Sequence, residues 1–143
     1  MANERNPSGL EAIDEEECWR LLEQHPIGRL GVAIANQPEI FPVNYVVDGR
    51  SIVFLTAEGT KFAAAVLGQA VAFEIDAADP LFHTGWSVVV RGRAHEIEQL
   101  DDLVAAEELP LRPWASGRKT RYVRITPEVV TGRRIVHGAT PSG

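Results

Sequence analysis

The chain has 143 residues, of which 45% are hydrophobic and 24% are charged, a balance typical of one ordinary globular domain. Its formal net charge of -6 at pH 7 argues against binding to nucleic acid or anionic membranes over a broad surface. One cysteine, Cys18, excludes an internal disulfide, and no apolar run approaches the ~20 residues of a membrane span. The first residues also lack the apolar region of a signal peptide, so we expect a cytoplasmic protein.

The first helix is predicted to follow a polar, flexible N-terminal segment, residues 1–12. Asp14, followed three residues later by Glu17, is typical of a helix N-terminus, because side-chain oxygens there accept hydrogen bonds from free backbone N–H groups. Pro26 cannot continue a helix, so we expect this one to end near His25.

Short β-prone runs fill most of the remaining chain. About six strands with few helices predict a mainly β (α+β) protein, a small antiparallel barrel with helices packed outside it. Pro42 lies within the second run, and because proline has no N–H to donate, it predicts a sheet edge or a bulge at that point. The predicted strands are 29–35, 40–47, 52–56, 70–76, 86–97 and 122–126, with a further run at 129–135, and the later helices are 60–67 and 100–109.

The residues from 52 to 67 change from a β-prone run to an alanine-rich one, so a strand is predicted to end near Thr56 and a helix to begin near Thr60. Lys61 would place an ammonium beside the unpaired N–H groups of that helix start, a combination that favours phosphate. The alternative is that Lys61 is an exposed lysine beside an ordinary turn.

Five segments follow one another in a distinctive order: Gly28 to Gly31, Phe41 to Tyr45, Thr56 to Lys61, Gly85 to Gly92 and Arg124 to Glu128. Together they resemble the pyridoxamine 5'-phosphate oxidase-like family of flavin-binding split barrels over roughly residues 13–135. The resemblance implies a six-stranded antiparallel split β-barrel with a few flanking helices, as one domain over 13–137 followed by a flexible tail at 138–143. It also implies a homodimer that binds flavin mononucleotide (FMN) in two equivalent clefts between subunits. Similar actinobacterial proteins use a deazaflavin instead.

The resemblance also implies which residues contact the cofactor. Thr56, Thr60 and Lys61 would bind its phosphate. Oxidases of the family have an arginine beside the lysine where this chain has Thr60, so the phosphate is expected either to bind more weakly or to be held partly by Arg29, Arg118 or another distant basic residue. The second strand would lie against the flavin ring, two residues of the partner chain would approach it, and Trp114 would close the cleft. The full set is Phe41, Pro42, Val43, Asn44, Thr56, Ala57, Thr60, Lys61, Trp86, Ser87 and Trp114.

The chemistry is expected to come from the cofactor, so no catalytic residue is assigned within a flavin-dependent oxidoreductase of unknown substrate. The C-terminal arginine and histidine that contact pyridoxal phosphate in true oxidases have no counterpart in 128–143, which argues against vitamin B6 oxidation. The histidines and Cys18 lack the spacing of a metal site. Trp86 also fits a core or dimer-interface position. A non-catalytic flavin-binding protein and a structural dimer without cofactor remain alternatives.

Overall fold

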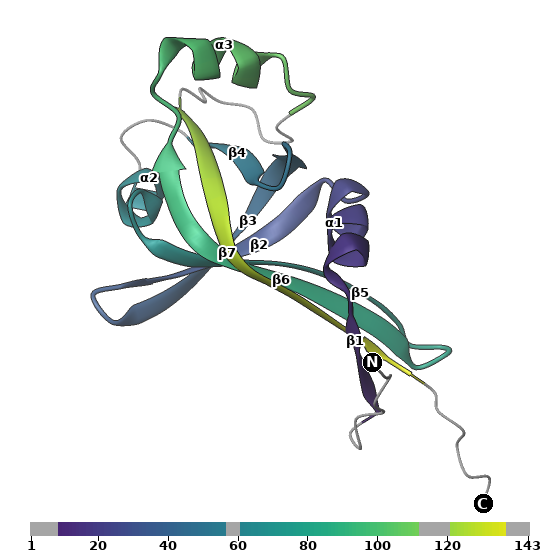
Figure 1. The fold of residues 1–143 in the computed structure, drawn as a ribbon. Coiled ribbons are helices and arrows are strands. Elements are labelled where there is room, and N and C mark those ends of the chain that lie inside the picture. Colours follow the sequence, from purple (N-terminus) through teal and green to yellow (C-terminus); the bar gives the residue numbers. More distant parts are fainter. Residues whose placement is uncertain (1–8, 57–60, 112–120, 137–143) are drawn as a thin grey trace, which may run out of the picture.

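The structure is a computed structural model that describes residues 9–56, 61–111 and 121–136, with the side chains of residues 61 and 62 outside the description. Figure 1 shows a strongly bent sheet with helices around it. In chain order the elements are β1 (Leu10–Ile13), α1 (Glu15–Glu23), β2 (Ile27–Ile34), β3 (Gln37–Val47), β4 (Ile52–Thr56), α2 (Lys61–Val66), β5 (Ala70–Asp79), β6 (Thr84–Glu96), α3 (Leu100–Glu107) and β7 (Arg121–Ile135).

All seven strands form one antiparallel sheet in the order β1-β7-β4-β3-β2-β5-β6, and an additional pairing of β6 with β7 closes it. The mainly β fold with few helices is therefore confirmed. The expected six strands are those of the closed barrel, and β1 is a seventh strand paired with the end of β7. Residues 10–12, expected to be flexible, thus belong to the sheet. Four residues are too few to show a β periodicity, and it is pairing with β7 that extends them.

A single strand of 15 residues, β7, replaces the two runs expected at 122–126 and 129–135. The register between β6 and β7 shifts between Arg91 and Gly92, so Glu128 is an extra residue on β7. Such a bulge bends a strand without ending it. The chains are so close here that a Cβ on Gly92 would lie 2.1 Å from the carbonyl oxygen of Thr126.

Pro42 lies on an edge segment of β3 and not in a bulge. The register between β2 and β3 runs without a shift from Ile27–Asn44 to Ile34–Gln37. The ladder of β3 with β4, in contrast, covers only residues 45–47 of β3 among the described residues. Pro42 therefore needs no N–H donor on that side, which confirms the edge alternative and makes the bulge alternative wrong.

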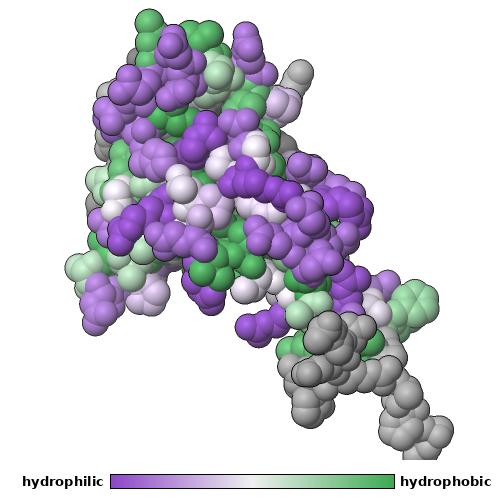
Figure 2. Space-filling model, viewed as in Figure 1, coloured by the Kyte–Doolittle hydropathy of each residue, from purple (hydrophilic) through white to green (hydrophobic). Residues whose placement is uncertain are grey.

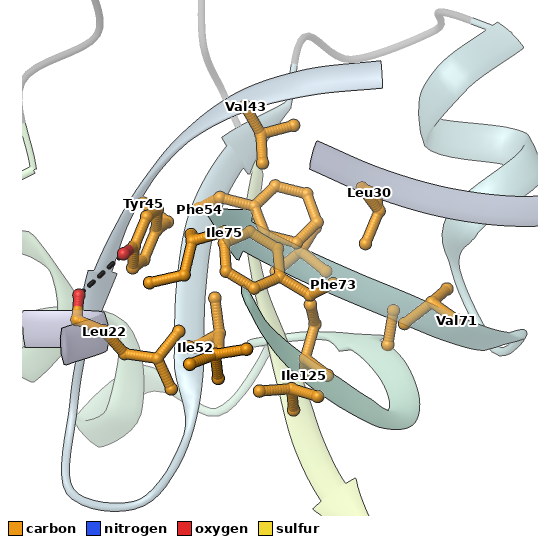
Figure 3. Close-up of a cluster of buried hydrophobic side chains, with 14 of the residues drawn as sticks. Leu22, Leu30, Val43, Tyr45, Ile52, Phe54, Val71, Phe73, Ile75 and Ile125 are labelled. Carbon is orange, nitrogen blue, oxygen red and sulfur yellow. Dashed lines mark hydrogen bonds between the residues drawn. The ribbon is translucent and has the colours of Figure 1, made fainter. Parts of the chain in front are cut away.

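The main core fills the barrel interior and extends to α1. Figure 3 shows Phe54, Phe73 and Ile125 among its buried side chains. The hydroxyl of Tyr45 donates a hydrogen bond of 2.6 Å to the carbonyl oxygen of Leu22 and so ties α1 to the barrel. As predicted, Asp14 caps α1 by accepting a hydrogen bond from the backbone N–H of Glu17 at 2.9 Å.

A second, smaller cluster packs α3 against the outside of β4 through Val53, Ile97 and Ala106. Hydrophilic side chains cover much of the face visible in Figure 2, with hydrophobic patches between them. Within the described ranges, none of the helices has the length and apolar composition that crossing a bilayer requires.

Candidate functional site

The sheet divides between β3 and β4, and we call this point, between Val43 and Thr56, the fork. Tyr45 and Phe54 are the last pair of the β3–β4 ladder among the described residues. Beyond them β3 continues along β2, while β4 continues along β7 as far as Thr56, its final residue. The register of the ladder would place Val43 opposite Thr56, one on each arm of the fork. Two segments that the resemblance assigns to one cofactor therefore meet here.

The hydroxyl of Thr56 is the polar group that the fork leaves unsatisfied. Thr56 is only 1% exposed, and its Oγ1 is buried with no hydrogen-bond partner among the described residues. A hydroxyl buried in this way costs about 1–3 kcal/mol. A ligand oxygen at the fork could offset that cost by accepting a hydrogen bond from Thr56, so the residue fits a phosphate group.

The helix after the fork begins where the sequence predicts it. Its first residue is Lys61, one position after the expected start near Thr60. The position of the Lys61 ammonium lies outside the description, as do Ala57, Thr60 and Trp114. Of the three predicted phosphate ligands, Thr56 is the one whose side chain lies within the described residues.

Arg29 forms salt bridges with two acidic side chains of β5. Its Nη1 lies 3.2 Å from Oε1 of Glu74 and 3.5 Å from Oδ1 of Asp76. With two carboxylates beside it, the guanidinium has little net positive charge to offer a phosphate, which argues against the role expected for Arg29. Arg118, the other candidate, lies outside the described residues.

The four β3 residues assigned to the flavin ring do not share a face. Phe41 and Val43 pack against the main core, so their side chains point into the barrel. Pro42 and Asn44 alternate with them and belong to the outer face of the sheet. A flavin beside this segment would meet the side chains of one pair and only the backbone of the other.

Trp86 lies far from the fork within one chain. On β7, Trp86 pairs with Arg134 and Thr56 pairs with Arg121, thirteen residues apart, or roughly 43 Å along an extended strand. The Trp86 ring packs against the core, with its centroid 5.2 Å from that of His25. These contacts fit the core interpretation of Trp86. A site shared by Thr56 and Trp86 would require a second copy of the chain.

Ser87 is separated from Trp86 by the pleat of the strand. It pairs with Asp76 on one side and with Arg133 on the other, on the outer face of the sheet. Because neighbouring residues of a strand point to opposite faces, the side chains of Trp86 and Ser87 cannot line one surface together. Ser87 instead shares its face with Pro42 and Asn44.

Comparison with known proteins establishes the family. Residues 14–134 match the family described as pyridoxamine 5'-phosphate oxidase. The chain belongs to this family. The match covers most of the barrel and confirms the resemblance found in the sequence.

Relatives of this pyridoxamine 5'-phosphate oxidase family member span nearly its whole length. The uncharacterized protein Rv0080 of Mycobacterium tuberculosis is 41% identical over 130 residues, which cover 87% of this chain and 84% of the relative. A solved FAD-binding protein from Mycobacterium smegmatis is 40% identical with a TM-score of 0.77, covering 87% and 97% of the two chains. A candidate pyridoxamine 5'-phosphate oxidase from Corynebacterium glutamicum is 37% identical with a TM-score of 0.78, covering 89% and 98%.

The structure of this family member adds a charged cluster that the sequence analysis missed. Burial and the neighbouring Asp76 carboxyl raise the pKa of Glu74 to about 7, although Arg29 acts in the opposite direction. The signal was present in the sequence, because the strand expected at 70–76 places Glu74 and Asp76 on one face. Only the register shows that Arg29 of β2 lies opposite Glu74.

Proposed function

We propose that this protein is a cytoplasmic homodimer that binds FMN and acts as a flavin-dependent oxidoreductase. Family membership and the FAD-binding relative from Mycobacterium smegmatis support a flavin nucleotide. The observation that carries the proposal is the buried Thr56 hydroxyl at the fork, which lacks a partner among the described residues. When bound, the flavin supplies hydride or electron transfer, and the protein binds and orients it.

The phosphate is proposed to bind between Thr56 and the start of α2. Thr56 donates a hydrogen bond from Oγ1, and Thr60 and Lys61 add the hydroxyl and ammonium expected from the family motif. Hydrogen bonds to charged groups contribute roughly 1.5–3 kcal/mol each, so two or three suffice to hold a phosphorylated cofactor in an acidic protein. Phe41 to Asn44 form the wall against the ring, with Ala57 beside the phosphate.

The proposed homodimer is supported by exposed apolar side chains on the outer face of the sheet. Ile40 on β3 is 71% exposed and Val129 on β7 is 47% exposed, and both belong to this face. They are in one row of the sheet with β2, β5 and β6 between them, and exposed apolar side chains on one face are what a protein partner would bury. A second copy would also be needed for Trp86 or Ser87 to approach the flavin held at the fork of its partner.

FAD is the second candidate cofactor, because it is the cofactor named for the relative that is 40% identical. A deazaflavin is a third, from the family resemblance. Releasing the cofactor from purified protein and measuring its mass distinguishes the three. A yellow protein that shows no turnover with reduced nicotinamides and added acceptors would be a non-catalytic flavin carrier. A colourless protein that takes up none of the three cofactors contradicts the proposal.

Thr56→Val tests the phosphate contact, with Thr56→Ser as the matched control that keeps the hydroxyl. We expect Thr56→Val to weaken binding of FMN by about 10-fold or more, the equivalent of at least ~1.4 kcal/mol, and Thr56→Ser to change it little. Because the hydroxyl has no partner among the described residues, Thr56→Val should leave the melting temperature of flavin-free protein unchanged or higher. Equal FMN affinity in the two variants would remove Thr56 from the site.

A further inference from the structure

The outer face of the sheet carries a compact charged cluster beside the proposed ring wall. Across neighbouring strands, Pro42 of β3 pairs with Arg29 of β2, Arg29 with Glu74 of β5, and Glu74 with Val89 of β6. Asp76 follows two residues after Glu74 and therefore shares its face. Arg29 is thus one strand away from Pro42 and Glu74 is two strands away, in the same row of the sheet.

The cluster contains one more carboxyl than it has cations. Arg29 contacts both carboxyl groups through one nitrogen, at 3.2 Å from Glu74 and 3.5 Å from Asp76. Two neighbouring carboxylates repel each other, and a single guanidinium compensates only one of them. Protonating one carboxyl removes the repulsion and lets it donate a hydrogen bond to the other.

The residues directly beside Glu74 and Asp76 on β6 supply no further positive charge. Toward β6, Glu74 faces Val89 and Asp76 faces Ser87, and neither partner is charged. Toward β2 and β3, the row contains only Arg29 and Pro42. The desolvated Glu74 carboxyl has a pKa raised to about 7, in agreement with this count of charges. The nearest other arginines on this face are Arg133, which is in the row of Asp76 beyond Ser87, and Arg91, which is opposite Ala72.

We propose that Glu74 and Asp76, positioned by Arg29, share one proton at neutral pH and form the proton-exchanging pair of the flavin site bordered by Pro42 and Asn44. This inference rests on the proposed function. It assigns the proton donor that the sequence leaves open. Glu74 exchanges the proton, while Asp76 and Arg29 are positioning residues.

The proton transfer is balanced within the cluster. The O–H bond of the Glu74 carboxyl breaks, a new bond forms between that proton and an oxyanion or basic nitrogen of the substrate, and no electron moves with it. Glu74 is left as a carboxylate whose charge Arg29 compensates. Asp76, whose side chain is 44% exposed, provides a path by which solvent returns a proton to the pair.

The shared proton is tested first on flavin-free protein, by following carboxyl carbons with NMR across a pH titration. We expect wild type to show a carboxyl that titrates near pH 7. Glu74→Gln should abolish that titration, and Asp76→Asn should move it to lower pH by at least about one unit, because the like charge is gone. Glu128→Gln, at an exposed position of β7, should leave it in place. A wild-type protein whose carboxyls all titrate below pH 5.5 overturns the proposal.

The role beside the flavin is tested by reoxidising the photoreduced, FMN-loaded protein with a soluble quinone at different pH values. In wild type the rate should fall as pH rises through about 7, whereas Glu74→Gln should be at least tenfold slower at pH 6 and nearly independent of pH. FMN affinity should stay within about twofold of wild type. If FMN binds and Glu74→Gln leaves the pH profile unchanged, the role is overturned while the proposed function stands. If wild type binds no flavin, both fail.

Discussion

Thr56 lies beside one end of β7 and Trp86 beside the other, and the two differ in the partners that their own chain provides. At one end, Thr56 beside Arg121 has a buried hydroxyl with no partner among the described residues. At the other end, Trp86 beside Arg134 packs on the core and against His25 of its own chain. A buried polar group that its own chain leaves unsatisfied indicates a ligand more strongly than an aromatic ring with several contacts. The fork is therefore the better supported part of the proposed site.

The largest expected effect is a loss of stability when the bulge of β7, which lies between these two ends, is disturbed. Gly92→Ala would place a Cβ 2.1 Å from the Thr126 carbonyl oxygen, a backbone atom that cannot move without disturbing the bulge of β7. We expect unfolding in urea to show a loss of about 3 kcal/mol or more. Gly31→Ala is the control, because its Cβ would meet no atom closer than 3.7 Å. Equal stability of the two variants would show that β7 can bend differently.

Mixing two variants tests whether Thr56 of one protomer and Trp86 of the other contribute to the same flavin site. Thr56→Val and Trp86→Ala are expected to weaken FMN binding, each by tenfold or more if both residues contact the cofactor. In a dimer with one protomer of each kind, a site made from both chains would be intact once per dimer. Random mixing after unfolding and refolding should then restore roughly a quarter of wild-type sites, counted by flavin fluorescence. If Trp86→Ala alone binds FMN normally, so that about half of the sites in the mixture bind flavin, Trp86 contributes to the core and not to the site.

A smaller effect concerns the charged cluster between the two ends. The pKa of Glu74 is raised from 4.5 to about 7 on folding, so the folded protein holds a proton that the unfolded chain releases at lower pH. The stabilisation associated with that proton is complete below pH 4.5 and is lost as pH rises through about 7. Glu74→Gln should therefore gain stability relative to wild type between pH 5 and pH 8, by about 1 kcal/mol after allowing for solvent screening.

Urea unfolding of wild type and Glu74→Gln at pH 5 and pH 8 measures this difference in stability. Glu128→Gln should differ from wild type by the same amount at both pH values, since this exposed side chain lies outside the cluster. A Glu74→Gln protein whose stability relative to wild type does not change with pH would contradict a raised pKa at Glu74.

Local chemistry made much of the fold predictable. Asp14 caps α1 because its oxygen can reach the N–H of Glu17 three residues later, and this geometry depends only on nearby residues. Pro42 indicates an edge because it has no N–H to donate. The change of pattern between residues 52 and 67 correctly predicted where β4 ends and α2 begins. Each of these features is decided within a few residues.

The features that the sequence did not predict depend on pairing between distant segments. Strand β1 exists because β7 extends beyond the barrel to pair with it. The Glu74 cluster needs the register of β2 against β5 to bring Arg29 opposite. The separation of Thr56 from Trp86 follows from the length of β7 and its two partners. Periodicity indicates which face a residue occupies, but register decides what it meets there.

The pairing of β1 with the end of β7 has a practical consequence for handling the protein. Because Leu10 pairs with Ile135, β1 begins beside the place where β7 ends. Gly9 and Val136 are joined there by a backbone hydrogen bond of 2.9 Å, beside the end of β7 that pairs with Trp86 and away from the end that pairs with Thr56. A short linker between residues 9 and 136 should therefore support a circularly permuted version opened at the tip of the β2–β3 hairpin.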